Sequence, residues 1–281
     1  MDPNVIVVNV DILIGGHAHD MTSAVVREQL ITVASLPHCV GAFVSIDCGS
    51  WSVLRYVRPG PIVVRSLPHH PEGIPRADGS LAESVVSGNA CLHTALDCCE
   101  ALMTRGKFCI FESPPSRGRG SPFAIEGRED HAHMFSHPRM LRFMAQHGTR
   151  SVFTDQCRTR EGEPKSAIKT TQLECTPNIY VPVHRRFSPL VCNHSGGHAT
   201  MTGEVLPQGD FESEKFAPYS SVMNGLIAES IKDVLEPGWT VPVPAPAVPA
   251  TPERSPLADW DLWDTSFGED VEYIEDDDGE P

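Results

Sequence analysis

The chain has 281 residues, of which 40% are hydrophobic, and a net charge of −15. This length suffices for a domain with a buried core, and no apolar run is long enough to cross a bilayer, so the composition argues against a membrane-spanning chain. The first residues lack the basic start of a secretory signal. The nine irregularly spaced cysteines do not resemble a disulfide framework. We therefore expect an intracellular protein, nuclear or cytoplasmic, without membrane contacts.

The charge is unevenly distributed along the chain. Residues 237–281 hold twelve acidic residues and one basic residue, so −11 of the net charge lies in this tail and −4 in residues 1–236. A run of prolines opens the tail and predicts an extended linker, and the acidic end has too little apolar content to fold alone. We expect a folded domain over 1–236 and a disordered tail over 237–281. The tail either solubilises the chain or docks its aromatic residues on a protein partner.

The body alternates β-rich runs with helical patterns. In chain order, the patterns predict a buried strand at 5–13, a helix at 21–35, a strand at 41–46, a helix at 80–105, a strand at 107–111, a helix at 129–147, a strand at 150–154 and a helix at about 220–235. Such alternation requires crossover connections. The expected fold is therefore α/β, with a Rossmann-like, mostly parallel sheet and helices on both faces.

Polar segments follow three of the predicted strands, at 47–50, 112–115 and 155–160. Ligands of open parallel sheets bind beyond the carboxyl ends of the strands, so these segments are expected to share one rim. Together they provide one thiol, Cys48, one carboxyl, Glu112, and two guanidinium groups, Arg158 and Arg160. Methylation at C5 of cytosine needs such a set. A thiolate adds to C6, an acid near N3 stabilises the developing charge, and guanidinium groups hold the base edge and phosphates.

The same segments resemble motifs of the cytosine-C5 DNA methyltransferases, especially methyltransferase-like domains of retroelements and phages. Asp47-Cys48 resembles the family's Pro-Cys motif, Glu112-Ser113-Pro114 its Glu-Asn-Val or Glu-Asn-Pro motif, and Gln156-Cys157-Arg158-Thr159-Arg160 its Gln-x-Arg-x-Arg motif. Ser221–Leu235 resembles the family's final helix, which returns to the cofactor pocket. The similarity covers residues 5–236.

This resemblance implies a class I methyltransferase-like fold, S-adenosylmethionine as methyl donor and nucleic acid as partner, with DNA favoured over RNA. It implies Cys48 as the nucleophile, Glu112 as the proton donor to N3, Arg158 and Arg160 as clamps for base and phosphate, and Asp11 and Asn224 as cofactor contacts.

The sequence departs from the family pattern in ways that leave a second function open. Asp47 replaces the proline before the cysteine, and a carboxylate there is expected to raise the pKa of the Cys48 thiol. The glycine-rich cofactor motif is expected before Val5, where only four residues stand, so we expect an N-terminally truncated domain. The alternative to an enzyme is a non-catalytic domain derived from a mobile element, which binds partners through its acidic tail.

Two further patterns also have alternative interpretations. Cys175, Cys192, His194 and His198 include a Cys-x-His-x-x-x-His spacing that suits zinc, but a Gly/His-rich surface loop is the preferred interpretation, so no zinc is expected. Residues 113–116 resemble the Ser-Pro-Pro-aromatic motif of amino-methyltransferases. Ser116 cannot stack on a base, which disfavours that interpretation.

Overall fold

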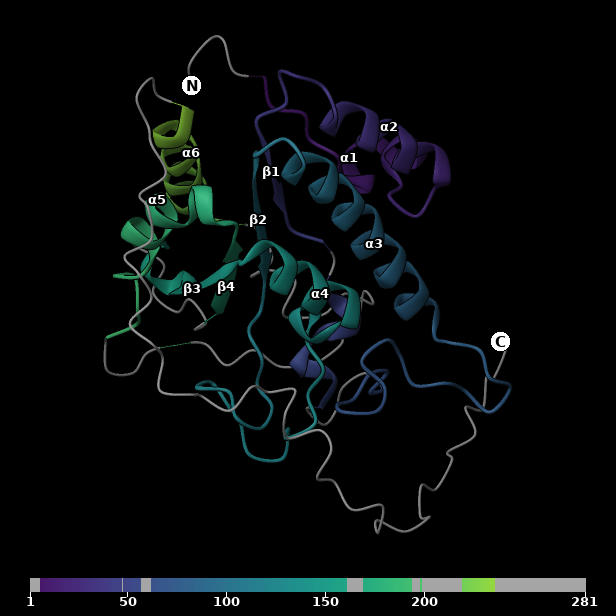
Figure 1. Cartoon of the computed structure of the whole chain (residues 1–281). Helices are drawn as coiled ribbons and strands as arrows, with labels where there is room; N and C mark the ends of the chain where they lie inside the picture. The colour runs from purple at the N-terminus through teal and green to yellow at the C-terminus, as the bar shows by residue number, and fades with distance from the viewer. Residues whose placement is uncertain are drawn as a thin grey trace.

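The computed structural model describes residues 6–46, 48–56, 62–160, 169–193, 198 and 219–235. Figure 1 shows the strands and helices of this part of the chain. The strands are β1 (Gly41–Val44), β2 (Phe108–Ser113), β3 (Arg150–Asp155) and β4 (Thr170–Cys175). The α-helices are α1 (Ile12–Gly15), α2 (Ala24–Ala34), α3 (Glu83–Met103), α4 (Pro138–His147), α5 (Pro177–Phe187) and α6 (Ser221–Leu235). The acidic tail, Asp47 and His194 lie outside the described residues.

The strands form one sheet in the order β1-β2-β4-β3. β1 pairs parallel to β2, whereas β4 pairs antiparallel to both β2 and β3. The predicted α/β class with helices on both faces is confirmed, but the sheet is mixed rather than mostly parallel. Because β4 runs opposite to both of its neighbours, β1, β2 and β3 still point in one direction.

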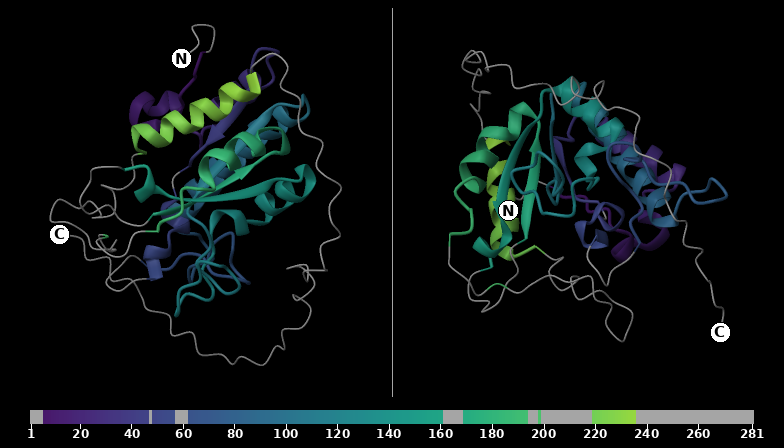
Figure 2. Two further views of the ribbon diagram at one scale, coloured as in Figure 1. Left: turned by 90° about the vertical axis from the view of Figure 1, so that its left-hand side faces the viewer. Right: turned by 90° about the horizontal axis from the view of Figure 1, so that it is seen from below.

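Helices cover both faces of the sheet, as Figure 2 shows. On one face, α3 and α4 pack on side chains that include Cys109 and Phe111, with α2 outside α3. On the other face, α5 and α6 pack on Ile110, Val152 and Leu173. All six residues of β2 are buried, as expected for a strand with a helical layer on each side. The two hydrophobic clusters together form the core of the domain.

Hydrogen bonds hold the ends of α4 and join α6 to α5. His137 caps the start of α4, where its Nδ1 accepts the Arg139 N–H at 3.2 Å, and Gly148 ends the helix with φ 60°. The helix predicted at 129–147 therefore has the right end, but it begins nine residues later, at Pro138. On the other face, Asp233 of α6 accepts from both Nη atoms of Arg186 of α5, at 2.6 and 3.1 Å. Asp233 also pairs with Arg185.

The predicted strand at 5–13 is wrong. Residues 6–10 have no regular secondary structure, and α1 begins at Ile12. Ile6 is 87% exposed and Leu13 is 91% exposed, so this apolar run is not part of the core. A strand is stable only where another strand completes its ladder, and none of the described strands pairs with this segment.

Candidate active site

The carboxyl ends of β1 and β2 meet around the side chain of Glu112. Glu112 is only 5% exposed, and its Oε2 accepts hydrogen bonds from Ser45 Oγ at 2.8 Å and from the Tyr219 hydroxyl. Ser45 directly follows β1, and Tyr219 precedes α6. The second oxygen, Oε1, is also buried and has no hydrogen-bond partner among the described residues. A buried carboxyl oxygen without a partner is rare and marks a position where a ligand can form a hydrogen bond.

Tyr219 closes this site from the side of α6. Its ring stands edge-on to Phe43 of β1, with the centroids 6.2 Å apart. Burial raises the pKa of Tyr219 well above its usual value, and the charge of Glu112 adds to this shift, so the hydroxyl remains a hydrogen-bond donor. Cys48 contributes to the same shift, which places its thiol within electrostatic range of the phenol. The structure therefore joins Glu112 and Tyr219 at one edge of the sheet, with Cys48 in electrostatic range of Tyr219.

Cys48 begins a short 3₁₀ turn, Gly49–Trp51, and its carbonyl accepts the Trp51 N–H at 2.9 Å. This turn is fixed by Arg65, a 2% exposed arginine that the sequence analysis did not single out. Arg65 donates to Ser50 Oγ at 3.2 Å, and its guanidinium lies 4.2 Å from the centre of the Trp51 ring.

The same guanidinium of Arg65 reaches α3, where it donates to Asn89 Oδ1 at 2.8 Å. Burial lowers the pKa of Arg65 to about 10, which still leaves it charged at neutral pH. Gly88 permits α3 to approach the turn closely. A Cβ at that position would lie 2.9 Å from Ser50 Oγ and 3.2 Å from the Trp51 ring. Arg65 and Gly88 are therefore positioning residues for the segment that begins at Cys48.

His131 joins the turn after β1 to the loop after β2. Its Nδ1 accepts the Arg117 N–H at 3.0 Å, and its Nε2 lies 3.0 Å from the Trp51 carbonyl. Because Nδ1 is the acceptor, the neutral ring carries its proton on Nε2 and donates it to Trp51. Burial lowers the pKa of His131 to about 4, so the ring is neutral at physiological pH.

The two predicted arginine clamps lie beyond β3. Arg158 Nη1 donates to Asn193 Oδ1 at 3.0 Å, whereas its Nε is buried and has no partner among the described residues. Arg160 is half-buried and is the last described residue before the gap at 161–168. No hydrogen bond or ion pair of the described residues joins either arginine to Glu112.

The two predicted cofactor contacts belong to different helices, α1 and α6. Asp11 caps α1, where its Oδ1 accepts the Leu13 N–H at 2.8 Å. Its expected role depended on a position at the end of a strand, and that strand does not form. Asn224 is exposed in the first turn of α6, and its N–H donates to the Ser220 carbonyl.

The predicted metal ligands separate into two groups. Cys175 is buried at the end of β4, opposite Arg150 at the start of β3. Cys192 lies at the other end of β3, where its N–H donates to Asp155 Oδ2 at 2.7 Å. The structure therefore does not bring Cys175 to Cys192. Cys192 is instead close to His198 and to Cys157, which the sequence analysis did not consider as a ligand.

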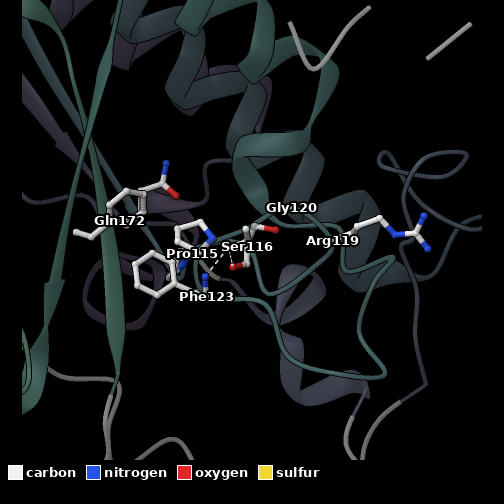
Figure 3. A pocket seen from close by; sticks show the side chains of 9 residues that line it. Pro115, Ser116, Arg119, Gly120, Phe123 and Gln172 are labelled. Carbon is white, nitrogen blue, oxygen red and sulfur yellow. Dashed lines mark hydrogen bonds between the residues drawn. The ribbon is translucent and has the colours of Figure 1, made fainter. Parts of the chain in front are cut away.

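A hollow of about 260 Å³ lies beside the loop after β2, between Pro115, Phe123, Phe153 and Gln172 (Figure 3). The Phe123 and Phe153 rings are 4.9 Å apart between centroids. Gln172 pairs with Phe153 across the sheet, on the face opposite to Leu173 and the α5–α6 layer. Glu112 points toward that layer, so the hollow and Glu112 lie on opposite faces. Cofactor pockets usually measure about 300–1,000 Å³, so the hollow is small for one.

Comparisons with protein-family models, curated proteins and solved structures gave no match to this chain. Within the described residues, every helix is too short or too polar to span a bilayer.

Proposed function

We propose that the chain is a cytosine-C5 methyltransferase-like domain that acts on nucleic acid at the rim formed by Cys48 and Glu112. The observation that carries the proposal is the buried Oε1 of Glu112, which lacks a donor among the described residues, at the strand end that also gathers Tyr219 and Cys48. Cys48, Glu112 and Arg158 lie at the carboxyl ends of β1, β2 and β3, which point in the same direction, and this order supports the same function.

In this site, the Cys48 thiolate adds to C6 of an extruded cytosine, and the ring becomes an enamine that is nucleophilic at C5. A proton held between Glu112 and N3 of the bound base neutralises the charge that develops on the ring. Ser45 and Tyr219 hold Oε2 of the carboxyl, so that Oε1 is directed to the base. Arg65 and His131 fix the two segments that carry Cys48 and Glu112.

The methyl donor that the resemblance implies is S-adenosylmethionine. The described residues do not fit it well, because Asp11 caps a short helix, Asn224 is exposed, and the hollow on the opposite face is small. The proposal therefore concerns the base-activating half of the reaction, which needs no cofactor.

Base activation has a signature of its own. Once Cys48 has added to C6, solvent can protonate C5, and loss of the original C5 proton followed by loss of the thiolate regenerates cytosine. In D₂O this cycle places deuterium at C5. We expect the full chain to catalyse this exchange in a pool of random-sequence duplexes, measured by mass spectrometry of the released nucleosides.

Variants make the exchange test specific. We expect Cys48→Ser to abolish the exchange and Glu112→Gln to slow it by about a hundredfold or more, the range for loss of a catalytic proton donor. Cys91→Ser, on α3, is the matched thiol control and should retain the wild-type rate. No exchange by the wild-type chain, or equal exchange by Cys48→Ser, contradicts the proposal.

The second candidate is the non-catalytic binding domain, and the poor fit of the cofactor contacts favours it. Calorimetry with S-adenosylmethionine separates the two functions. Binding heat together with C5 exchange supports an enzyme, whereas a chain that gives neither and still binds a partner through residues 237–281 supports the binding domain.

A further inference from the structure

Two thiols and an imidazole meet beside the carboxyl end of β3. Cys157 lies in the 3₁₀ turn Gln156–Arg158, and Cys192 and His198 follow α5. One ligand atom from each of the three residues lies within 4.8 Å of the other two, and Cys192 Sγ is 3.2 Å from His198 Nε2. Cys157 is buried, and the other two residues are half-buried.

Hydrogen bonds hold the segment after α5 against the end of β3. The Asp155 N–H donates to the Leu190 carbonyl at 2.8 Å, and the Asp155 carboxylate accepts the Cys192 N–H at 2.7 Å. Thr170 Oγ1 of β4 fixes the other oxygen of the same carboxylate at 2.7 Å. Cys157 and Cys192 are thus positioned by the protein fold itself, as the ligands of a built metal site are.

We propose that Cys157, Cys192 and His198 bind a zinc ion. Thiolate sulfur and imidazole nitrogen are the donors that zinc selects in tetrahedral sites. Zinc bonds of about 2.0–2.3 Å separate neighbouring ligand atoms by about 3.3–3.8 Å in a tetrahedron. The 3.2 Å between Cys192 and His198 is close to that range, and a small inward movement of the half-buried side chains completes the set.

This site differs from the one that the sequence pattern offered, since Cys157 takes the place of Cys175. The fourth tetrahedral position is open to water or to a donor from the residues that the structure does not describe. A bound ion would link the turn after β3 to the segment after α5. It would thereby fix Arg158, which already contacts Asn193.

The test is metal binding by the full chain, purified with a reductant and then stripped with a chelator. We expect one zinc ion per chain in a competition titration against a chromogenic chelator, and a higher Tm with zinc than without it. Cobalt(II) should give the absorption of a tetrahedral cobalt–thiolate centre. We expect Cys192→Ser and His198→Asn to weaken zinc binding by more than about tenfold.

Both substituted side chains are half-buried, so these variants should fold, and circular dichroism checks that they do. Cys91→Ser is the matched control and should bind zinc like the wild type. Failure to bind one zinc ion, or unchanged binding by Cys192→Ser, overturns the proposal. A reduced chain that ignores zinc but forms a Cys157–Cys192 disulfide on mild oxidation overturns it in favour of a redox pair. None of these measurements depends on the proposed action on cytosine.

Discussion

Gly88 lies where α3 passes against the turn that begins at Cys48. We expect Gly88→Ala to lower the free energy of unfolding by about 1–2 kcal/mol. The new methyl group would overlap Ser50 and the buried Trp51 ring. The free-energy cost of this overpacking exceeds the gain in helix propensity, which is at most about 1 kcal/mol. Urea denaturation of the purified variant measures the change.

Gly225→Ala is the matched control. Gly225 lies within α6, and a Cβ there meets nothing within 4 Å among the described residues. The alanine should therefore stabilise the chain by about 0.5–1 kcal/mol through helix propensity alone. If both variants were equally stabilising, the close approach of α3 to the Cys48 turn would be wrong.

At the residue scale, the sequence indicated those candidate site residues whose place in the chain follows from the local pattern. Cys48 and Glu112 stand directly after apolar runs, and polar residues at strand ends are accessible to ligands. Ser45, Tyr219 and Arg65 were missed because their partners are distant in the chain. Tyr219, for example, bonds a carboxylate 107 residues earlier. Gly88 lies inside the helix predicted at 80–105, and a glycine at such a position is a local indication of close packing.

At the scale of elements, an ion pair with α5 adds to the apolar packing that docks α6. Arg186 contacts Asp233 with both Nη atoms, and the hydrogen bond from Arg186 lowers the pKa of that carboxyl. We expect Asp233→Asn to lower the free energy of unfolding by about 1 kcal/mol. A partly buried carboxylate that contacts a guanidinium through two hydrogen bonds stabilises a protein more than an exposed ion pair does. Thermal denaturation at neutral pH measures this loss.

Glu229→Gln, on the exposed side of the same helix, removes one negative charge without touching Arg186. Its Tm should stay within about 1 °C of the wild type, as is usual for surface changes. A loss equal to that of Asp233→Asn would mean that the overall charge of α6, and not the ion pair with α5, causes the loss of stability.

The sequence predicted β1, β2, β3, α2, α3 and α6 because each shows an apolar pattern of the right period. It missed β4, whose Gln172 and Glu174 interrupt the apolar pattern although both are buried. Glu174 is accommodated by hydrogen bonds from Thr149 and Ser151, which are visible only in the fold. It also missed α5, which contains Pro182. The failed strand at 5–13 had the right composition but no partner strand.

At the scale of the whole molecule, buried neutral histidines should make the fold sensitive to acid. Burial lowers the pKa of His131 to about 4 and that of His137 to about 3, whereas an unfolded histidine has a pKa of about 6.5. The unfolded chain therefore binds more protons between these values. The stability that both residues contribute is complete above about pH 6.5 and falls as the pH is lowered toward 4.

The expected slope is about 1.4 kcal/mol per pH unit for each histidine, measured by urea denaturation from pH 7.5 to 4.5. His137→Asn keeps a cap for α4 and should remove one histidine's share of the slope. His38→Asn replaces an exposed histidine and is the control for the substitution itself. A slope that His137→Asn does not alter would show that His137 is not buried as a neutral ring.

The hydrogen bonds of His131 with Arg117 and Trp51 also make its Nε2 proton a spectroscopic probe of the folded domain. Its Nε2 proton is enclosed between the ring and the Trp51 carbonyl, so it should exchange slowly with water and give a separate, downfield proton resonance. That resonance is present only while the segments after β1 and β2 remain joined. A ligand that separates them would erase the signal before any helix unfolds, which makes this proton a direct spectroscopic measure of whether the rim is intact.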